Sequence, residues 1–225
     1  MLGNVFEKNM EFSQHDLQQL DKSFRAQLVN SLSGFKSANL LGSQNKLGQT
    51  NLAIISSVFH LGADPALVGF IMRPHSVPRH SLENILATGF YTLNQVNNAI
   101  WQAAHQTSAR YESDESEFDM VGLTPQYLNG FEAPFVEQCH IKYGVELQST
   151  QTLVNQTELV IGEIKHIYLP NNALMADGFI DLASVGTVTV SGLDCYSTTT
   201  PLSRLSYAKP HQAVKPLDVS GDIIK

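Results

Sequence analysis

The chain has 225 residues, of which 43% are hydrophobic and 16% are charged, as is typical of a soluble globular protein. Its 21 acidic and 14 basic side chains give a net charge of −7, which argues against non-specific binding to nucleic acid. No apolar run approaches the ~20 residues that are needed to span a bilayer.

The start of the chain, MLGNVFEKNMEF, has neither a basic segment nor an apolar one. We therefore expect no signal peptide and a cytoplasmic protein. The two cysteines, Cys139 and Cys195, are too few and too far apart to suggest a disulfide scaffold or a zinc site. We expect both to be buried free thiols, and no metal.

Residues 13–34 predict a helix. Apolar side chains recur along one face of it, at Leu17, Leu20, Phe24 and Leu28. Asp16 stands three residues after Ser13, in a weak variant of the capping box, and Gly34 closes the helix. We expect it to pack against the main domain or a second subunit.

Residues 35–42 and 49–59 predict two strands that pair as a hairpin through a turn at 44–48. In the second strand, one face is expected to belong to the core while the other can approach a ligand. The small residues Ala53, Ser56 and Ser57 would let a flat ring lie against backbone N–H and C=O groups. From these residues alone, an edge strand whose serines bond to a neighbour is the better explanation.

Residues 66–72 are almost wholly apolar and predict a buried strand that leaves the core at Arg73 and Pro74. A helix is predicted over 81–88, with Ser81 as its N-cap and Gly89 after its end.

Arg73, Arg79, His80 and the Ser81 hydroxyl crowd at the start of this helix, where free N–H groups and the helix dipole favour an anion. They indicate a phosphate site. Arginines in a loop are often only solvated charges, Ser81 can be only a cap, and Glu83 competes for the same positive field. The residues alone leave both interpretations open.

The rest of the chain is mainly of β type. We expect strands at 90–96, 135–147, 158–169 and 187–196, helical segments at 97–108 and 118–121, a polar loop at 110–116, and a turn with a short helical lead at 173–178. Beyond residue 210 too few apolar residues remain to form a packed element, so we expect an extended arm or a partly disordered tail. The motifs of dinucleotide-binding folds, P-loops, zincins and serine hydrolases do not occur in the sequence.

Ten short stretches, taken in order and spacing, strongly resemble the flavin reductase-like proteins of the flavoredoxin type, a branch of the FMN-binding split barrels. They are NLA–SS (51–57), RP (73–74), RHSLENI (79–85), TGFYTLN (88–94), AH–TSARY (104–111), SEF–VGLT (116–124), APFVE (133–137), IGEI (161–164), DGFIDL (177–182) and SGLDCY (191–196). The resemblance covers roughly residues 30 to 210.

The resemblance implies a mainly β fold, an antiparallel Greek-key split β-barrel with peripheral helices. The absence of repeated strand–helix alternation agrees with this. We expect a helical extension (1–34), one split-barrel domain (35–210) and a tail (211–225).

The resemblance also implies an NAD(P)H:flavin oxidoreductase. FMN, rather than FAD, is expected because a phosphate held by a helix start needs nothing larger. The cofactor-binding residues expected are Asn51, Leu52, Ala53, Ser56 and Ser57 for the ring, Arg73, Arg79, Ser81 and Asn84 for the phosphate, and His105 near the nicotinamide. His105 could instead interact with the terminal carbonyls of its own helix.

No catalytic residue is assigned, since a bound flavin supplies the redox chemistry itself. The family implies a homodimer with the flavin near the subunit interface, and a monooxygenase or another electron acceptor as partner. Two alternatives remain: a flavin-binding electron-transfer protein without its own nicotinamide site, and a barrel that has lost the cofactor.

Overall fold

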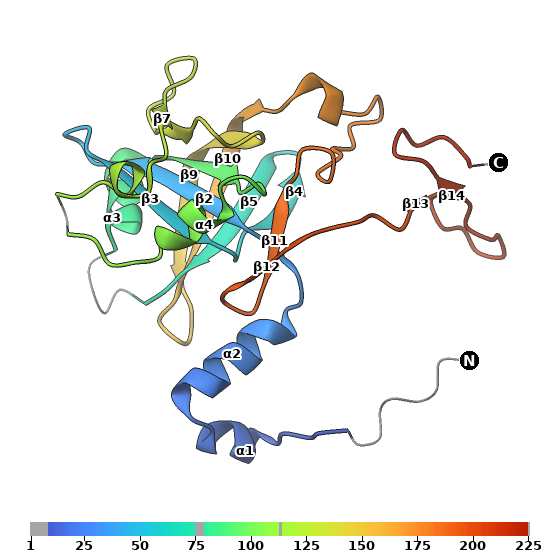
Figure 1. Cartoon of the computed structure of the whole chain (residues 1–225), viewed down its shortest axis with the longest axis horizontal. Helices are drawn as coiled ribbons and strands as arrows, with labels where there is room; N and C mark the ends of the chain where they lie inside the picture. Colours follow the sequence, from blue (N-terminus) through green and yellow to red (C-terminus); the bar gives the residue numbers. More distant parts are fainter. Residues whose placement is uncertain (1–8, 75–78, 113, 225) are drawn as a thin grey trace.

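A computed structural model describes residues 9–74, 79–112 and 114–224 of the chain (Figure 1). Residues 75–78 of the predicted basic loop, Ser113 of the polar loop, and residues 1–8 of the chain start lie outside the described residues.

The chain is mainly β, as predicted, with its helices at the periphery. The helices are α1 (Gln14–Gln19), α2 (Lys22–Leu32), α3 (His80–Thr88), α4 (Trp101–Gln106), α5 (Glu117–Val121) and the 3-10 turn η1 (Asn171–Ala173). The strands are β1 (Lys36–Ser37), β2 (Asn39–Gln44), β3 (Thr50–Ile55), β4 (Phe59–Ala63), β5 (Ala66–Met72), β6 (Phe90–Gln95), β7 (Pro125–Gln126), β8 (Phe135–Val136), β9 (Lys142–Thr152), β10 (Glu158–Tyr168), β11 (Val188–Ser191), β12 (Cys195–Thr198), β13 (Arg204–Leu205) and β14 (Pro216–Leu217).

The main sheet is antiparallel, with the strand order β3-β2-β6-β9-β10-β5-β4. Its two outermost strands, β3 and β4, are consecutive in the chain and are separated only by residues 56–58. One continuous stretch, residues 50–63, therefore forms both edges and closes the sheet into a barrel. We call residues 56–58 the switch segment, because here the chain leaves β2 and joins β5.

The described residues form three apolar cores, and the two larger ones lie on either side of the barrel wall. Residues of β2, β5, β6, β9, β10 and α3 share one of them, the inner core, which includes Leu41, Phe70 and Ile85. The outer core lies between β2, β3, α4, α5 and the small β1-β11-β12 sheet. Leu40 belongs to the outer core and Leu41 to the inner one, because successive side chains of a strand point to opposite faces.

The N-terminal helix predicted over 13–34 is two helices. Asp21 accepts hydrogen bonds from the backbone N–H groups of Ser23 and Phe24, and so begins α2 as its N-cap. The predicted capping box of Ser13 and Asp16 is confirmed. Neither helix contains a fully buried residue. Leu17, Leu20 and Leu28 of the predicted apolar face are half-buried and Phe24 is exposed, so this face is only partly covered within one chain.

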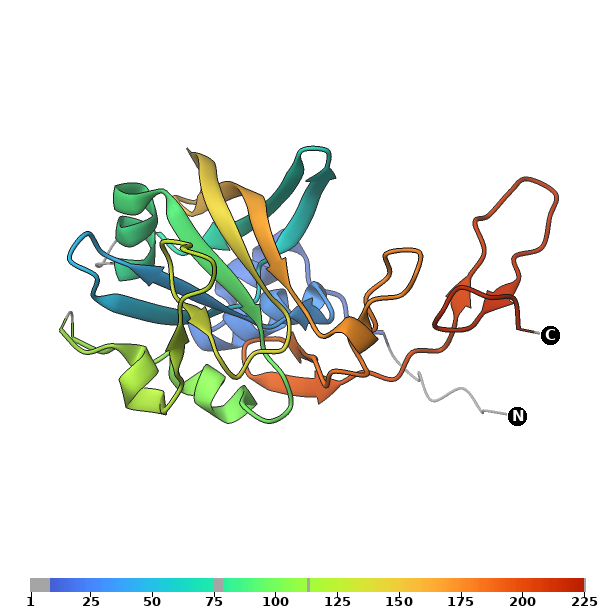
Figure 2. The same ribbon diagram turned by 90° about the horizontal axis from the view of Figure 1, so that it is seen from above.

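The C-terminal arm (residues 199–224) leaves the barrel after β12 and folds back as the β13–β14 hairpin. Figures 1 and 2 both show this hairpin standing away from the barrel. It is held near η1 by an ion pair between Arg204 and Asp177 and by the Arg204 guanidinium, which lies 4.3 Å from the centre of the Phe179 ring. The expected extended arm therefore contains a short β ladder. Its strands β13 and β14 lie before and after residue 210, where the sequence predicted the end of the domain.

Candidate functional site

The switch segment offers unpaired donors at the point where the barrel wall changes partner. Residues 56–58 belong to neither the β3 nor the β4 ladder. Within the described part of the chain, their three backbone N–H groups make no hydrogen bond, and the residues are half-buried. Because polar backbone groups are rarely left unpaired, this run of donors suits the acceptor atoms of a ligand.

The side chains of β3 differ from the expected division into a core face and a ligand face. Leu52 and Ile54 pack in the outer core, whereas Ile55 packs against the inner core. Both faces of the strand are used because it is the barrel wall between two cores. The unpaired backbone donors lie beyond the end of β3, at the switch segment.

Side chains from two helical segments occupy the outer edge of β3. The Glu117 carboxylate accepts a hydrogen bond from the backbone N–H of Leu52 at 2.8 Å, and the Thr107 hydroxyl accepts one from that of Ile54 at 2.9 Å. Sequence reasoning missed both residues. They lie in stretches that resemble the family, but no spacing in the sequence indicates contacts across 65 and 53 positions.

Asn51 is held between two elements. Its side-chain amide donates to Glu117 Oε2 at 2.6 Å, and its oxygen accepts from the Ser81 hydroxyl at 2.6 Å. All three residues are buried. Asn51 therefore joins the start of α5 to the first turn of α3, and both its side-chain nitrogen and its side-chain oxygen are engaged inside the protein.

Ser57 connects the switch segment to β5. Its hydroxyl donates to the Ile71 carbonyl at 2.9 Å and accepts from the Ile71 N–H at 3.0 Å. Arg73 follows only two residues later, so the end of β5 that carries this arginine is fixed beside the switch segment. What Ser57 offers to a ligand is its backbone N–H, since its hydroxyl is engaged.

The first turn of α3 differs in detail from the prediction. Arg79, and not Ser81, is the N-cap, and its N–H donates to Glu83 Oε1 at 3.1 Å. Ser81 lies inside the helix because its hydroxyl is directed to Asn51. The backbone N–H groups of residues 80–82 make no hydrogen bond within the described residues, so the turn presents the free donors that an anion requires.

Positive charge gathers at this turn. Partial burial lowers the pKa of Arg79, and the neighbouring charges of Arg73 and Arg110 lower it further. Arg110, in the loop after α4, is therefore a third guanidinium near the α3 start, and sequence reasoning did not select it. Like charges are held together at a cost, and an anion between them would relieve it.

Two predicted residues face other partners. The Asn84 amide donates to the Ser43 hydroxyl at 3.2 Å. The His105 ring lies 3.0 Å from the Tyr196 hydroxyl, so its contact is with β12 and not with the carbonyls that end its own helix.

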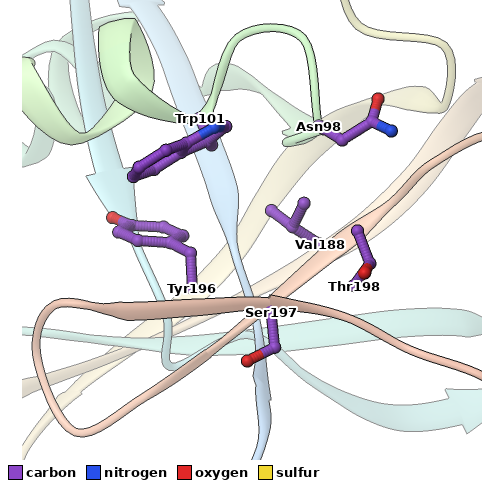
Figure 3. Close-up of a pocket in the computed structure, with 6 residues that line it drawn as sticks. All are labelled: Asn98, Trp101, Val188, Tyr196, Ser197 and Thr198. Atoms are coloured by element: carbon purple, nitrogen blue, oxygen red, sulfur yellow. The ribbon is translucent and has the colours of Figure 1, made fainter.

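A shallow pocket of about 110 Å³ is lined by Tyr196 and by Trp101 of α4. Figure 3 shows the Trp101 ring above the Tyr196 ring, with Asn98 and Val188 on the other side of the pocket. The two ring centres are 5.5 Å apart. Trp101 is 39% exposed, so this aromatic surface is open to solvent.

The cysteines match the prediction only in part. Both are free thiols, but only Cys139 is buried, whereas Cys195 is exposed at the start of β12. The expected burial of Cys195 is wrong because β12 is the outer strand of the three-stranded sheet.

The structure thus brings together, along the edge of β3 and the connection from β5 to α3, six of the ten predicted residues: Asn51, Leu52, Ser57, Arg73, Arg79 and Ser81. Ser56 lies in the switch segment and Ala53 within β3. This surface combines free backbone donors with clustered guanidinium groups.

Residues 34–181 match the flavin reductase like domain family, and the chain belongs to this family. It is therefore one of the flavin-related oxidoreductases. No curated protein is significantly similar to the chain.

Solved structures agree with this family assignment. A Shewanella frigidimarina NCIMB 400 protein, assigned as a flavin reductase with a split barrel domain, is 56% identical, with a TM-score of 0.86 over 89% of this chain and 100% of that one. Nitrilotriacetate monooxygenase component B from Bacillus cereus (17% identity, TM-score 0.78, 88% and 100% covered) and flavoredoxin from Desulfovibrio vulgaris (Miyazaki F) (19%, 0.66, 80% and 93%) share the fold. The predicted split-barrel class is confirmed.

No helix among the residues that the structure describes is both long and apolar enough to cross a bilayer.

Proposed function

We propose that the chain binds FMN between the switch segment and the start of α3 and catalyses hydride transfer from NAD(P)H to the flavin. The polar edge of the ring is placed at the switch segment and the phosphate at the start of α3. When bound, the flavin supplies a ring that accepts the hydride, while the protein binds and orients it.

The observation that carries this proposal is the pair of donor sets at the two ends of one surface. The three free N–H groups of residues 56–58 match the carbonyl oxygens and ring nitrogens at the polar edge of a flavin. The free N–H groups of residues 80–82 and the cluster of Arg73, Arg79 and Arg110 match a phosphate.

The order of the two sets along the chain suits a ligand with a ring at one end and a phosphate at the other. Asn51 is tied to the start of α3 and Ser57 is tied to β5, so the two sets lie at the two ends of residues 51–57. FMN needs no second phosphate site, which makes it the preferred flavin over FAD.

The nicotinamide is assigned to the open side of the ring, near α4. The exposed Trp101 and the half-buried Tyr196, with His105, would provide a stacking surface for a planar group. No acid or base is required from the protein for the hydride itself, so none of these residues is given a catalytic role.

Two measurements test the proposal. Apoprotein titrated with FMN should bind it more tightly than riboflavin, which lacks the phosphate. The FMN-loaded protein should then lose its yellow colour when NADH or NADPH is added without oxygen. Bleaching by one donor and not the other would identify the donor.

Other outcomes select the alternatives. Flavin binding without bleaching by either nicotinamide would favour an electron-transfer protein that is reduced by a partner. Failure to bind any flavin would overturn the proposal and leave a barrel that has lost its cofactor.

We further propose a homodimer whose second subunit lies near the flavin. Apolar side chains on α2 and directly after it are exposed in the single chain, namely Phe24, Val29, Leu32 and Phe35. A second copy could cover them. Sedimentation at the monomer mass across micromolar concentrations would contradict this.

The reduced flavin is proposed to serve a monooxygenase or another electron acceptor. The Bacillus cereus protein of similar fold is by name a monooxygenase component, which makes this class of acceptor the first to test. A cytoplasmic location stays a prediction.

A further inference from the structure

Hydrogen bonds run in one direction through three buried side chains beside the proposed cofactor site. A carboxylate only accepts, so Glu117 must face the NH₂ group of Asn51. The Asn51 oxygen then faces Ser81, and the Ser81 hydroxyl must donate to it. The identity of residue 117 thus fixes the orientation of the other two.

This direction changes what Ser81 can do. Its only hydroxyl proton is used toward Asn51, so the hydroxyl cannot also donate to an anion while these bonds hold. Besides the guanidinium groups of the arginine cluster, the donors that remain at the start of α3 are the backbone N–H groups of residues 80–82. Ser81 therefore acts as the point by which the turn is held.

Glu117, at the α5 end of this series of hydrogen bonds, is held firmly against β3. Besides Asn51, Glu117 accepts from the Leu52 N–H, and the Ser116 and Thr50 hydroxyls are 2.7 Å apart. The start of α5 is therefore bound to β3 through three contacts, and Asn51 transmits this fixed position to α3.

We propose that Glu117 is a positioning residue of the cofactor site: acting through Asn51, it holds Ser81 so that the first-turn N–H groups of α3 face the cofactor's anionic group. The proposal rests on the proposed function for the identity of that anion. The tie itself is a property of the apoprotein and can be tested without any flavin.

The first test compares FMN and riboflavin binding to apoprotein in Glu117→Ala and Glu117→Gln. Alanine removes the acceptor, and FMN affinity should fall by at least about tenfold while riboflavin affinity changes much less. Glutamine keeps an acceptor oxygen of the same reach, so it should restore FMN affinity to within about threefold of the unmodified protein.

A matched control comes from the segment just before α5. Glu115 is an exposed carboxylate two residues before Glu117, and among the described residues it accepts a hydrogen bond from the nearby Glu112 N–H alone. Glu115→Ala makes the same change in net charge and should leave both affinities unchanged. A loss of FMN binding in this control would show a general charge effect and overturn the role of Glu117.

The second test measures amide hydrogen exchange in the apoprotein. The Glu83 N–H donates to the Arg79 carbonyl at 3.0 Å in the first helical hydrogen bond of α3. Its exchange should be at least about tenfold faster in Glu117→Ala and unchanged in Glu117→Gln. Unchanged exchange in the alanine variant would refute the tie even if the unmodified protein bound no flavin and the proposed function failed.

Asn51→Ala keeps the test decisive if Glu117→Ala does not fold, because Glu117 retains its bond to Leu52. This variant frees the Ser81 hydroxyl. If Ser81 is a point of attachment, FMN affinity falls selectively. If Ser81 is a direct phosphate ligand, FMN affinity is kept or improved, and the proposal is overturned. Equal losses for FMN and riboflavin would also contradict it.

Discussion

The two ends of β3 use their polar groups in opposite ways. At the start of the strand, Asn51 and the Leu52 N–H are buried, and they are hydrogen-bonded to Glu117 and Ser81. Beyond its end, the three N–H groups of residues 56–58 have no partner in the described part of the chain. The start of β3 fixes α3 and α5 by hydrogen bonds, whereas the switch segment after its end leaves donors available to a ligand.

This difference separates positioning from binding on a single surface. A ligand that takes the free donors of the switch segment meets a wall that the paired end has already fixed, so little ordering is needed on binding. Substitutions at the two ends of β3 should therefore have different effects on stability and on ligand binding.

The largest expected effect is the loss of the paired end. Glu117→Ala leaves the Asn51 amide and the Leu52 N–H without an acceptor in a buried place, and should lower the free energy of unfolding by about 3 kcal/mol. Urea unfolding of the apoprotein measures this. Glu115→Ala should stay within about 0.5 kcal/mol of the unmodified protein. Equal stabilities of the two variants would contradict the comparison.

The next effect concerns the anion cluster. Arg73→Ala should weaken FMN binding by at least about tenfold, because a charge-assisted hydrogen bond to phosphate contributes about 1.5–3 kcal/mol. Riboflavin should be affected much less. Fluorescence titration of the apoprotein gives both affinities.

Lys46→Ala is the control for Arg73→Ala, since it removes an exposed positive charge in the turn before β3. It should change neither affinity. If Arg73→Ala lowers FMN and riboflavin binding equally, Arg73 does not contact the phosphate, and Arg79 and Arg110 become the next residues to test.

Prediction from sequence succeeded where the signal was local. The apolar run at 66–72 matches β5 at both ends, because a strand that is buried over most of its length favours a continuous apolar stretch and Pro74 cannot extend it. The arginine cluster was visible because Arg73 and Arg79 adjoin the start of a helix. The break between α1 and α2 could also have been found, since Asp21 is a typical N-cap.

The hydrogen bonds along the start of β3 could not be predicted from local sequence patterns. Glu117 and Thr107 reach the strand from positions 65 and 53 residues further along, through single hydrogen bonds that leave no periodic pattern. The role of Ser81 was misassigned for the same reason: a serine near a helix start is normally a cap, and only the tertiary contact with Asn51 shows otherwise.

A smaller effect is expected at the open end. Ser57→Ala removes two hydrogen bonds to Ile71 at a half-buried site that water can reach, so the free energy of unfolding should fall by about 1 kcal/mol. Ser56→Ala is the matched control, because its hydroxyl bonds to nothing among the described residues. Should Ser56→Ala cost as much as Ser57→Ala, the Ser57 link would not close the barrel at this point.

The smallest expected effect is a difference in the rate at which the two cysteines are alkylated. Cys139 lies in the outer core behind the paired end, and burial raises the pKa of its thiol to about 12. Only the thiolate reacts with alkylating reagents, so at pH 8 Cys139 should stay unlabelled while the exposed Cys195 is labelled. Mass spectrometry should find one label per native chain and two after denaturation.

Because Glu117 holds α5 against β3 over this core, Glu117→Ala should speed the labelling of Cys139, whereas Ser57→Ala should not. Two rapid labels on the unmodified native chain would show that the core behind the paired end opens freely, and the contrast between the two ends of β3 would then be lost.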